Sequence, residues 1–156
     1  MNLRALLDKK NIILNLNVES KKRLMEFFAN RLASSHSSID EDQVLKSLYQ
    51  RERIGATYIG KNIYIPHCRV DGLTTTRIII VTLKNSYYDD TVNDDIKIVV
   101  GVFFPYKTSE IHTELLKQLA SFLKKAKTQK HFEEAECADV LHKLITKEKN
   151  DEESTE

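Results

Sequence analysis

Apolar residues at helical spacing predict three helices in the first third of the chain. A short helix is expected over residues 2–7, and a strongly amphipathic helix begins at Ser20. Asp40 followed by Gln43 resembles a capping box, which marks the start of the next helix. The apolar stripe that follows predicts that this third helix ends near residues 51–53.

Two runs rich in β-branched residues predict a buried sheet in the middle of the chain. Their near-continuous apolar character indicates strands covered on both faces, so helices must flank the sheet. The acidic stretch between the runs, residues 88–95, is expected to be a loop facing solvent. Beyond Pro105, apolar spacing predicts helices over residues 109–127 and 133–146. The expected strands or extended segments are 11–16, 77–83 and 96–104.

These elements together predict an α/β fold, a single-domain sandwich in which a mixed β-sheet is flanked by helices on both faces. The length of 156 residues and the 41% hydrophobic content are typical of one compact domain. We expect this domain to cover residues 1–147. Residues 148–156 are charged and poor in apolar side chains, and we expect them to form a disordered tail.

The charge balance and the cysteines narrow the classes of partner and compartment. The chain has 24 basic and 23 acidic residues interspersed along its length, so no field of one sign favours nucleic acid as a partner. No apolar run is long enough to cross a bilayer, and membrane insertion is not expected. Cys68 and Cys137 follow no secretory leader pattern, so we expect reduced thiols in a cytoplasmic protein.

Pro66 and His67 form the first candidate site. Proline fixes its own φ angle and biases the preceding residue toward extended geometry, so His67 is expected at a stiff strand end. A neutral imidazole is a competent nucleophile near neutral pH, and a phosphorylated ring nitrogen can pass its phosphoryl group to another acceptor. His67 is therefore a candidate for reversible phosphoryl transfer.

Phosphoryl transfer also needs groups that hold the phosphoryl oxygens. Arg51, near the end of its predicted helix, offers a planar guanidinium that can bind such oxygens in a bidentate manner. His112 lies in the first turn of the next predicted helix, on its apolar side, where the helix end favours anions. Asp94 or Asp95 could orient a ring nitrogen of His67.

Each of these residues also has a structural interpretation. A histidine after a proline is more often structural than catalytic, and an inward histidine on a helix is usually a satisfied core residue. A metal protein that uses His67, Cys68, His112 and Cys137 is an alternative, but this spacing matches no compact zinc pattern. Adjacent residues of a strand point to opposite faces, so His67 and Cys68 are badly placed to share an ion. We expect neither a metal nor a cofactor.

Residues 51–67 contain a pattern more specific than a single Pro-His pair. It is carried by Arg51-Glu52, Gly55-Ala56-Thr57, Ile59-Gly60 and Ile65-Pro66-His67. The pattern resembles the signature of the fructose/mannitol/nitrogen-regulatory class of phosphotransferase-system enzyme IIA domains. Other features from Leu6 to His112 follow in the family's order, so the resemblance covers about residues 1–147. It is greatest to the nitrogen-regulatory enzymes IIA.

The resemblance implies a phosphotransferase in which a histidine phosphocarrier protein phosphorylates Nε2 of His67. Arg51 matches the arginine that contacts the phosphoryl group, His112 matches the second active-site histidine, and Thr57 matches the threonine of the motif. Such a chain is a carrier with a phosphohistidine intermediate, without turnover of a small molecule. The fold that the resemblance implies, a mixed sheet flanked by helices, agrees with the fold predicted from the apolar pattern.

The chain departs from the family pattern beside the candidate site. Tyr64 stands where a small residue is usual, and Cys68 follows the histidine where glycine is common. Residues 93–95, Asn-Asp-Asp, replace a frequent Asp-Gly turn. These departures leave the candidate site residues in place, but they bear on donor specificity and transfer rate.

Three functional interpretations remain open. The stand-alone chain favours the nitrogen-regulatory branch, whose members control target proteins according to their phosphorylation state. A sugar-transport enzyme IIA would instead pass the phosphoryl group to an enzyme IIB of a permease. The third interpretation is a regulatory binding module that is not phosphorylated.

Overall fold

The computed structural model describes the backbone of residues 2–107 and 112–155, and the side chains of residues 2–107 and 112–147. The elements in chain order are α1 (Leu3–Leu6), the 3-10 helix η1 (Lys9–Asn11), β1 (Ile12–Leu16), α2 (Lys21–Ser35), α3 (Glu41–Ile54), β2 (Tyr58–Gly60), β3 (Ile63–Tyr64), β4 (His67–Val70), β5 (Arg77–Asp89), β6 (Asp94–Pro105), α4 (His112–Lys124), α5 (Ala126–Glu134) and α6 (Ala138–Thr155).

The sheet is mixed, as the sequence predicts. Its strands lie in the order β1-β5-β6-β3-β2, and β4 follows β3 along the same side of β6. β5 and β6 form an antiparallel centre, β1 pairs parallel with β5, and β3 and β4 pair parallel with β6. Among the strands described, β4 pairs with β6 alone, so it lies at an edge of the sheet.

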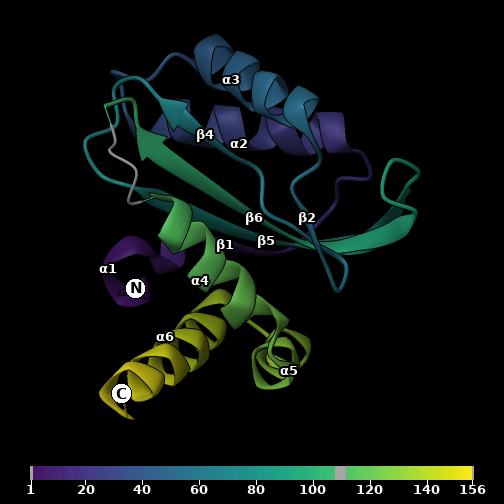
Figure 1. Ribbon diagram of the computed structural model, residues 1–156, viewed down its shortest axis with the longest axis vertical. Helices are drawn as coiled ribbons and strands as arrows, with labels where there is room; N and C mark the ends of the chain where they lie inside the picture. The colour runs from purple at the N-terminus through teal and green to yellow at the C-terminus, as the bar shows by residue number, and fades with distance from the viewer. Residues whose placement is uncertain (1, 108–111, 156) are drawn as a thin grey trace.

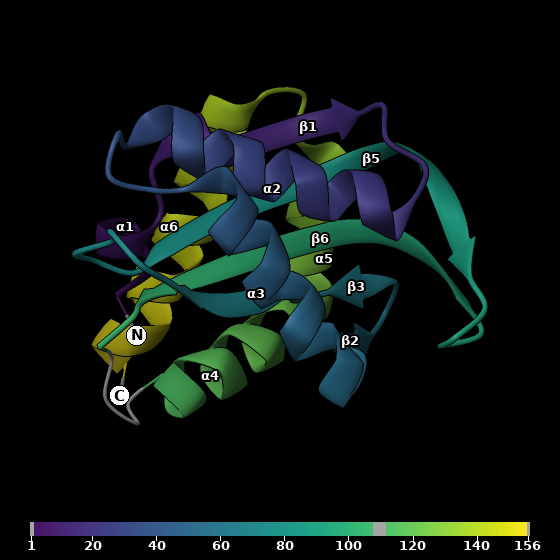
Figure 2. The ribbon, with the colours of Figure 1, turned by 90° about the horizontal axis from the view of Figure 1, so that it is seen from above.

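Helices cover both faces of this sheet, which confirms the predicted sandwich. α2 and α3 lie on one face, whereas α4, α5 and α6 lie on the other face together with α1 (Figures 1 and 2). Each face has its own buried apolar cluster. Phe28 and Phe103 belong to the cluster under α2 and α3, and Phe104 and Phe122 belong to the cluster under α4 and α6.

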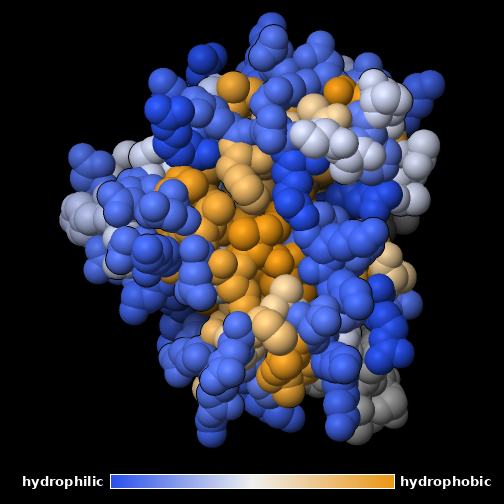
Figure 3. Space-filling view, turned by 180° about the vertical axis from the view of Figure 1, so that it is seen from behind, coloured by the Kyte–Doolittle hydropathy of each residue, from blue (hydrophilic) through white to orange (hydrophobic). Residues whose placement is uncertain are grey.

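β1 lies at the opposite edge of the sheet from β4 and contributes to both clusters. Ile13 and Leu16 pack against one cluster, and Ile12 and Leu14 pack in the other, because an irregularity at Asn15, with φ 58°, interrupts the alternation of the strand. Ile13, Leu14 and Leu16 are only half-buried. Figure 3 views the molecule from this side, where apolar side chains gather between the two helical layers. The edge is therefore less fully covered than the centre of the sheet.

The acidic stretch 88–95 was expected to be a loop, and that expectation is wrong for half of its residues. β5 continues to Asp89 and β6 begins at Asp94, so only residues 90–93 form the turn of a long hairpin. Asp89 is buried because its carboxylate accepts hydrogen bonds from the Tyr64 hydroxyl at 2.9 Å and from the backbone N–H of Thr91 at 3.0 Å. The hydrogen bond from Tyr64, which lies 25 positions earlier in the chain, cannot be predicted from the local charge pattern.

The C-terminal helices are divided differently from the prediction. The helix expected over residues 109–127 ends at Lys124, and residues 109–111 lie outside the described part of the chain. Lys125 has extended backbone angles, φ −67° and ψ 138°, which separate α4 from α5 without any proline or glycine. The helix expected over residues 133–146 begins at Ala138. Helix α6 extends to Thr155, and a domain boundary at residue 147 stays a prediction.

Gly101 allows two aromatic rings to pack over the centre of β6. A Cβ atom at this position would lie 2.7 Å from the Phe103 ring and 3.0 Å from the ring of Phe28, which is fully buried. At Gly55 a Cβ atom would meet no atom within 4 Å, and the backbone there is extended with φ 163°. The two glycines therefore form a matched pair for a test of close packing.

We expect Gly101→Ala to lower the free energy of unfolding by about 1–3 kcal/mol, because the added methyl group overpacks the core between Phe28 and Phe103. Gly55→Ala should change it by less than about 1 kcal/mol. Urea unfolding of both variants, followed by circular dichroism, measures the difference. Equal stabilities of the two variants would contradict the close approach at Gly101.

Candidate functional site

A rigid turn of the chain places His67 at the edge of the sheet. Pro66 is buried, and its carbonyl oxygen accepts the backbone N–H of Val102 at 3.0 Å. His67 is the first residue of β4 and is in register with Val102 of β6. Cys68 belongs to the cluster under α2 and α3, so the side chain of His67 leaves the strand on the other face. The stiff strand end expected from Pro66 is confirmed.

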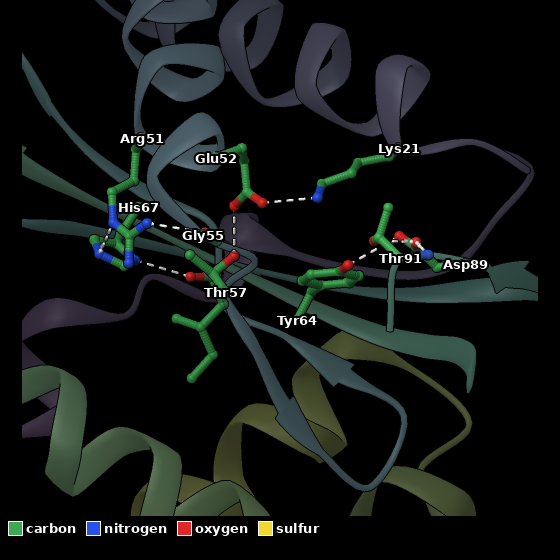
Figure 4. Close-up of polar contacts among 10 residues, drawn as sticks. Lys21, Arg51, Glu52, Gly55, Thr57, Tyr64, His67, Asp89 and Thr91 are labelled. Carbon is green, nitrogen blue, oxygen red and sulfur yellow. Dashed lines mark hydrogen bonds and ion pairs between the residues drawn. The ribbon is translucent and has the colours of Figure 1, made fainter. Parts of the chain in front are cut away.

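Two hydrogen bonds fix the orientation of the His67 ring (Figure 4). Nδ1 lies 3.0 Å from the carbonyl oxygen of Ile65, which can only accept a hydrogen bond. Nε2 lies 3.2 Å from Nε of Arg51, which can only donate one. The arrangement therefore selects the tautomer with the proton on Nδ1. The lone pair of Nε2 points toward the guanidinium.

Arg51 is held in this position by the end of its own helix. It lies in the last turn of α3, and its Nη1 donates to the carbonyl oxygen of Gly55 at 3.0 Å. The guanidinium is half-buried, so part of it is open to an incoming group. One planar cation thus contacts Nε2 of His67 and has further donors available beside it.

Burial is the largest cause of a lowered pKa at His67. The hydrogen bond to the Ile65 carbonyl raises this pKa, whereas the positive charge of Arg51 lowers it. Glu52 raises the pKa and His112 lowers it, both by charge. The net pKa lies below the ordinary value of 6.5, so the ring is neutral at neutral pH. A neutral ring with a free Nε2 lone pair is the nucleophilic form of histidine.

His112 approaches the same region from the other helical layer. It is half-buried at the start of the described part of α4, and its ring lies 5.0 Å from the ring of Phe104. Phe104 lies on β6 in register with Arg69, two residues after His67 on β4. The structure therefore packs His112 of α4 against the strand next to β4, and a hydrogen bond joins Arg51 of α3 to His67.

Thr57 lies beside the site but supports it through another residue. Its hydroxyl is buried and donates to Oε1 of Glu52 at 2.6 Å. The other carboxylate oxygen of Glu52 pairs with Nζ of Lys21 at 2.7 Å, and the Glu52 side chain is only 9% exposed (Figure 4). Because Glu52 follows Arg51 directly, this pair of contacts fixes the helix end that carries Arg51.

The sequence patterns assigned no role to Glu52 or Lys21. Glu52 directly follows Arg51 in the motif, and this position in the motif was the sequence signal that could have indicated a role for Glu52. Lys21 begins α2, thirty-one positions earlier in the chain, and no periodic pattern connects the two residues. Lys21 also lies 4.7 Å from the centre of the Tyr64 ring. This contact joins the start of α2 to the buried core beside the site.

The two unusual residues beside the histidine point away from it. Tyr64 is fully buried, and burial together with the hydrogen bond from its hydroxyl to Asp89 raises its pKa. Cys68 is buried in the cluster under α2 and α3, and burial raises the pKa of its thiol to about 12. Its sulfur is therefore a protonated core group at neutral pH, without the thiolate character of a reactive cysteine.

The expectation that Asp94 or Asp95 orients the His67 ring is wrong. Asp94 accepts hydrogen bonds from the Tyr58 hydroxyl and from the side-chain amide of Asn62, and it anchors the turn between β2 and β3. The Ile65 carbonyl occupies the position at Nδ1 instead. The acceptor is a backbone carbonyl, which every residue type has, so the sequence could not identify it.

Metal ligation and membrane insertion were also considered on the sequence. Within residues 2–107 and 112–147, the histidine, cysteine and acidic side chains form no group of three or more that could hold a metal ion. In the same part of the chain, no helix is both long and apolar enough to span a bilayer.

The chain matches a known protein family. Residues 5–148 match the family described as "Phosphoenolpyruvate-dependent sugar phosphotransferase system, EIIA 2". A nitrogen regulatory protein of Pseudomonas aeruginosa is 28% identical over 149 residues, which cover 95% of this chain and 97% of that protein.

Solved structures share the fold. The crystal structure of the nitrogen regulatory protein IIA-Ntr from Neisseria meningitidis superposes with a TM-score of 0.82 at 23% identity, over 92% of this chain and 98% of that one. Enzyme IIA for mannitol from Escherichia coli, solved in complex with phosphorylated enzyme IIB, gives a TM-score of 0.70 at 16% identity, over 90% and 98% of the two chains. The family match covers almost the whole chain, and we conclude that the protein belongs to the EIIA 2 family of the phosphoenolpyruvate-dependent sugar phosphotransferase system.

Proposed function

We propose that this protein is a phosphoryl carrier that accepts a phosphoryl group on Nε2 of His67 from a histidine phosphocarrier protein. The observation that carries the proposal is the fixed tautomer of His67, whose free lone pair lies 3.2 Å from Nε of Arg51. A nucleophile and the cation that stabilises the transferred group are thereby placed side by side.

The transfer needs little movement of protein groups. The Nε2 lone pair attacks phosphorus while the bond between phosphorus and the donor's ring nitrogen breaks, and that nitrogen keeps the electron pair. The proton stays on Nδ1 of His67 throughout, and Nδ1 keeps donating it to the Ile65 carbonyl oxygen. Arg51 exchanges its hydrogen bond with Nε2 for hydrogen bonds with the phosphoryl oxygens, and His112 is the second proposed donor to these oxygens.

Within this function we propose that the protein regulates partner proteins according to its phosphorylation state. This proposal is supported by the nitrogen regulatory protein of Pseudomonas aeruginosa, to which the chain is similar over nearly the full length of both. The second candidate is transfer to an enzyme IIB of a sugar permease, favoured by the shared fold with the mannitol enzyme that was solved in such a complex. Partner capture with the phosphorylated and unphosphorylated protein separates the two.

His67→Gln should abolish phosphorylation, because the acceptor nitrogen is removed while the size of the side chain is nearly kept. The protein is incubated with phosphoenolpyruvate, enzyme I and the phosphocarrier protein, and the mass increment of one phosphoryl group is measured on the intact chain. The matched control is His131→Gln, on α5 away from the site, which should be loaded like the wild type. An acid-labile phosphoryl group on the His67→Gln variant would overturn the proposal.

Arg51→Gln and His112→Gln should slow phosphorylation without removing the acceptor. Loss of one group that stabilises the transferring phosphoryl is expected to cost about 10²–10³ in rate for Arg51. The effect at His112 should be smaller, about tenfold, because one ring nitrogen supplies a single hydrogen bond, whereas a guanidinium can bind the phosphoryl oxygens in a bidentate manner. Rapid-quench measurement of the phosphorylated fraction gives both rates. Wild-type rates in both variants would refute these roles.

The lowered pKa of His67 predicts that the loading rate declines, as Nε2 becomes protonated, only at a more acidic pH than expected for a histidine with the ordinary pKa of 6.5. Arg51→Gln should raise the pKa of His67, since it removes a nearby positive charge, and Glu52→Gln should lower it further. Titration of the His67 ring protons by NMR measures each shift. Glu26→Gln is the control, because Glu26 pairs with Arg23 on the surface of α2. Shifts of the opposite sign would contradict the described electrostatics.

A further inference from the structure

A concave pocket lies on the face of the sheet opposite to the His67 side chain. It encloses about 520 Å³ between the C-terminal half of α2, the 3-10 helix η1 and the first residues of β5. The end of α2 and the start of β1 lie side by side in Figure 2, and the contacts of Arg31 with Lys10 and Asn11 join them. Three basic side chains line the pocket: Lys10, Arg31 and Arg77.

Arg77 is a half-buried cation with no carboxylate partner among the described residues. Its Nε is buried and has no hydrogen-bond partner in the same part of the chain. Its Nη2 donates to Nε2 of His36 at 3.3 Å, and no acidic side chain or backbone carbonyl of residues 2–107 and 112–147 is hydrogen-bonded to the guanidinium. A partly desolvated guanidinium that lacks a counter-ion is unfavourable, and an anion bound beside it would offset that cost.

A chain of hydrogen bonds orients this guanidinium. The Ser35 hydroxyl donates to the Leu32 carbonyl at 2.8 Å, so its oxygen is left to accept from Nδ1 of His36, also at 2.8 Å. Nε2 of His36 then carries the lone pair that accepts from Arg77. Nε2 of His36 therefore acts as an acceptor that orients the Arg77 guanidinium, and Nη1 of Arg77 has no acceptor among the described residues.

Arg31 provides a second oriented cation. Its Nε donates to the side-chain oxygen of Asn11 at 3.3 Å, and its Nη2 donates to the carbonyl oxygen of Lys10. Nη1 has no acceptor among the described residues. Asp8 is the acidic residue that lines the pocket, and one of its carboxylate oxygens accepts the backbone N–H of Lys10 at 3.0 Å. The pocket therefore has an excess of positive charge that its own residues do not neutralise.

We propose that this pocket binds a small organic anion, with a carboxylate or phosphate group between Arg31 and Arg77. Each guanidinium has a free Nη1 donor for such a group, and oriented arginines bind oxyanions through charge-assisted hydrogen bonds. One part of the wall is apolar, formed by half-buried Phe27 and by buried Leu32 and Ile79, and polar side chains of α2 such as Asn30 line the rest. The apolar part favours an anion with an apolar body over a bare inorganic ion.

The pocket is independent of the candidate phosphorylation site. Arg77 lies on β5 and His67 lies on β4, and β6 runs between these two strands. Arg77 is two positions before Ile79, which belongs to the cluster under α2 and α3, so it faces the layer opposite to His67. A bound anion would not obstruct a phosphocarrier protein at His67. The inference concerns a ligand site and goes beyond the proposed phosphoryl transfer.

The test is an NMR titration of the full chain with phenyl phosphate, benzoate and inorganic phosphate, and with benzyl alcohol as a neutral control. We expect saturable shifts of the Arg31 and Arg77 side-chain signals and of the Ser35 amide. Phenyl phosphate should bind more tightly than inorganic phosphate because its ring packs on the apolar wall, and benzyl alcohol should give no saturable shift. Comparison of phenyl phosphate with benzoate identifies the preferred anionic group.

Arg77→Gln and Arg31→Gln should each weaken the binding of whichever of phenyl phosphate and benzoate binds more tightly. The expected loss of affinity is about tenfold to a hundredfold, the effect of losing one charge-assisted hydrogen bond. Arg4→Gln, an exposed arginine of α1 outside the pocket, should leave the affinity unchanged. His67→Gln should also bind normally, so loss of the proposed phosphoryl transfer would not affect the result. Shifts confined to the His67 region, no saturation up to about 10 mM, or equal binding by Arg77→Gln and Arg4→Gln would overturn the proposal.

Discussion

The hydrogen bond between Nδ1 of His67 and the Ile65 carbonyl is the constraint on which the candidate site depends. It fixes the tautomer, and the tautomer decides which nitrogen has the free lone pair. The carbonyl is available because the chain turns at Pro66, a residue that has no N–H and a fixed φ angle. The edge position of β4 then leaves the ring open to groups from α3 and α4. Local chain geometry and sheet topology are both required.

A second, mainly electrostatic layer supports that geometry. Glu52 is held by Thr57 and Lys21, and its negative charge partly compensates for Arg51 at the imidazole. Lys21 in turn lies over Tyr64, whose hydroxyl contacts the buried Asp89 of the β5–β6 hairpin. The site is therefore connected through close contacts to the start of α2 and to the far end of the hairpin.

The sequence predicted the fold class from apolar periodicity, and a compact motif predicted that Arg51 and His67 belong to one site, where a hydrogen bond joins them. The roles of Arg51, His67 and His112 stay predictions. It did not predict the break at Lys125, where the helix ends without proline or glycine. It also placed Asp89 in a loop, since the buried partners of that carboxylate are distant in the chain. The backbone acceptor at Ile65 and the ion pair between Lys21 and Glu52 are likewise tertiary contacts. Such contacts arise only once the strands and helices have assembled.

The contact of Arg51 with the resting imidazole has a thermodynamic consequence for a carrier. The same guanidinium that would stabilise a phosphoryl group already stabilises the empty site through the lone pair of Nε2. Loading would therefore exchange one favourable interaction for another, and the net gain would be smaller than the full strength of an arginine–phosphate contact. A small net gain keeps the phosphoryl group transferable. A site that bound the group too tightly would not release it to an acceptor, and a site that lost the Arg51 contact without gaining phosphoryl contacts would not be loaded.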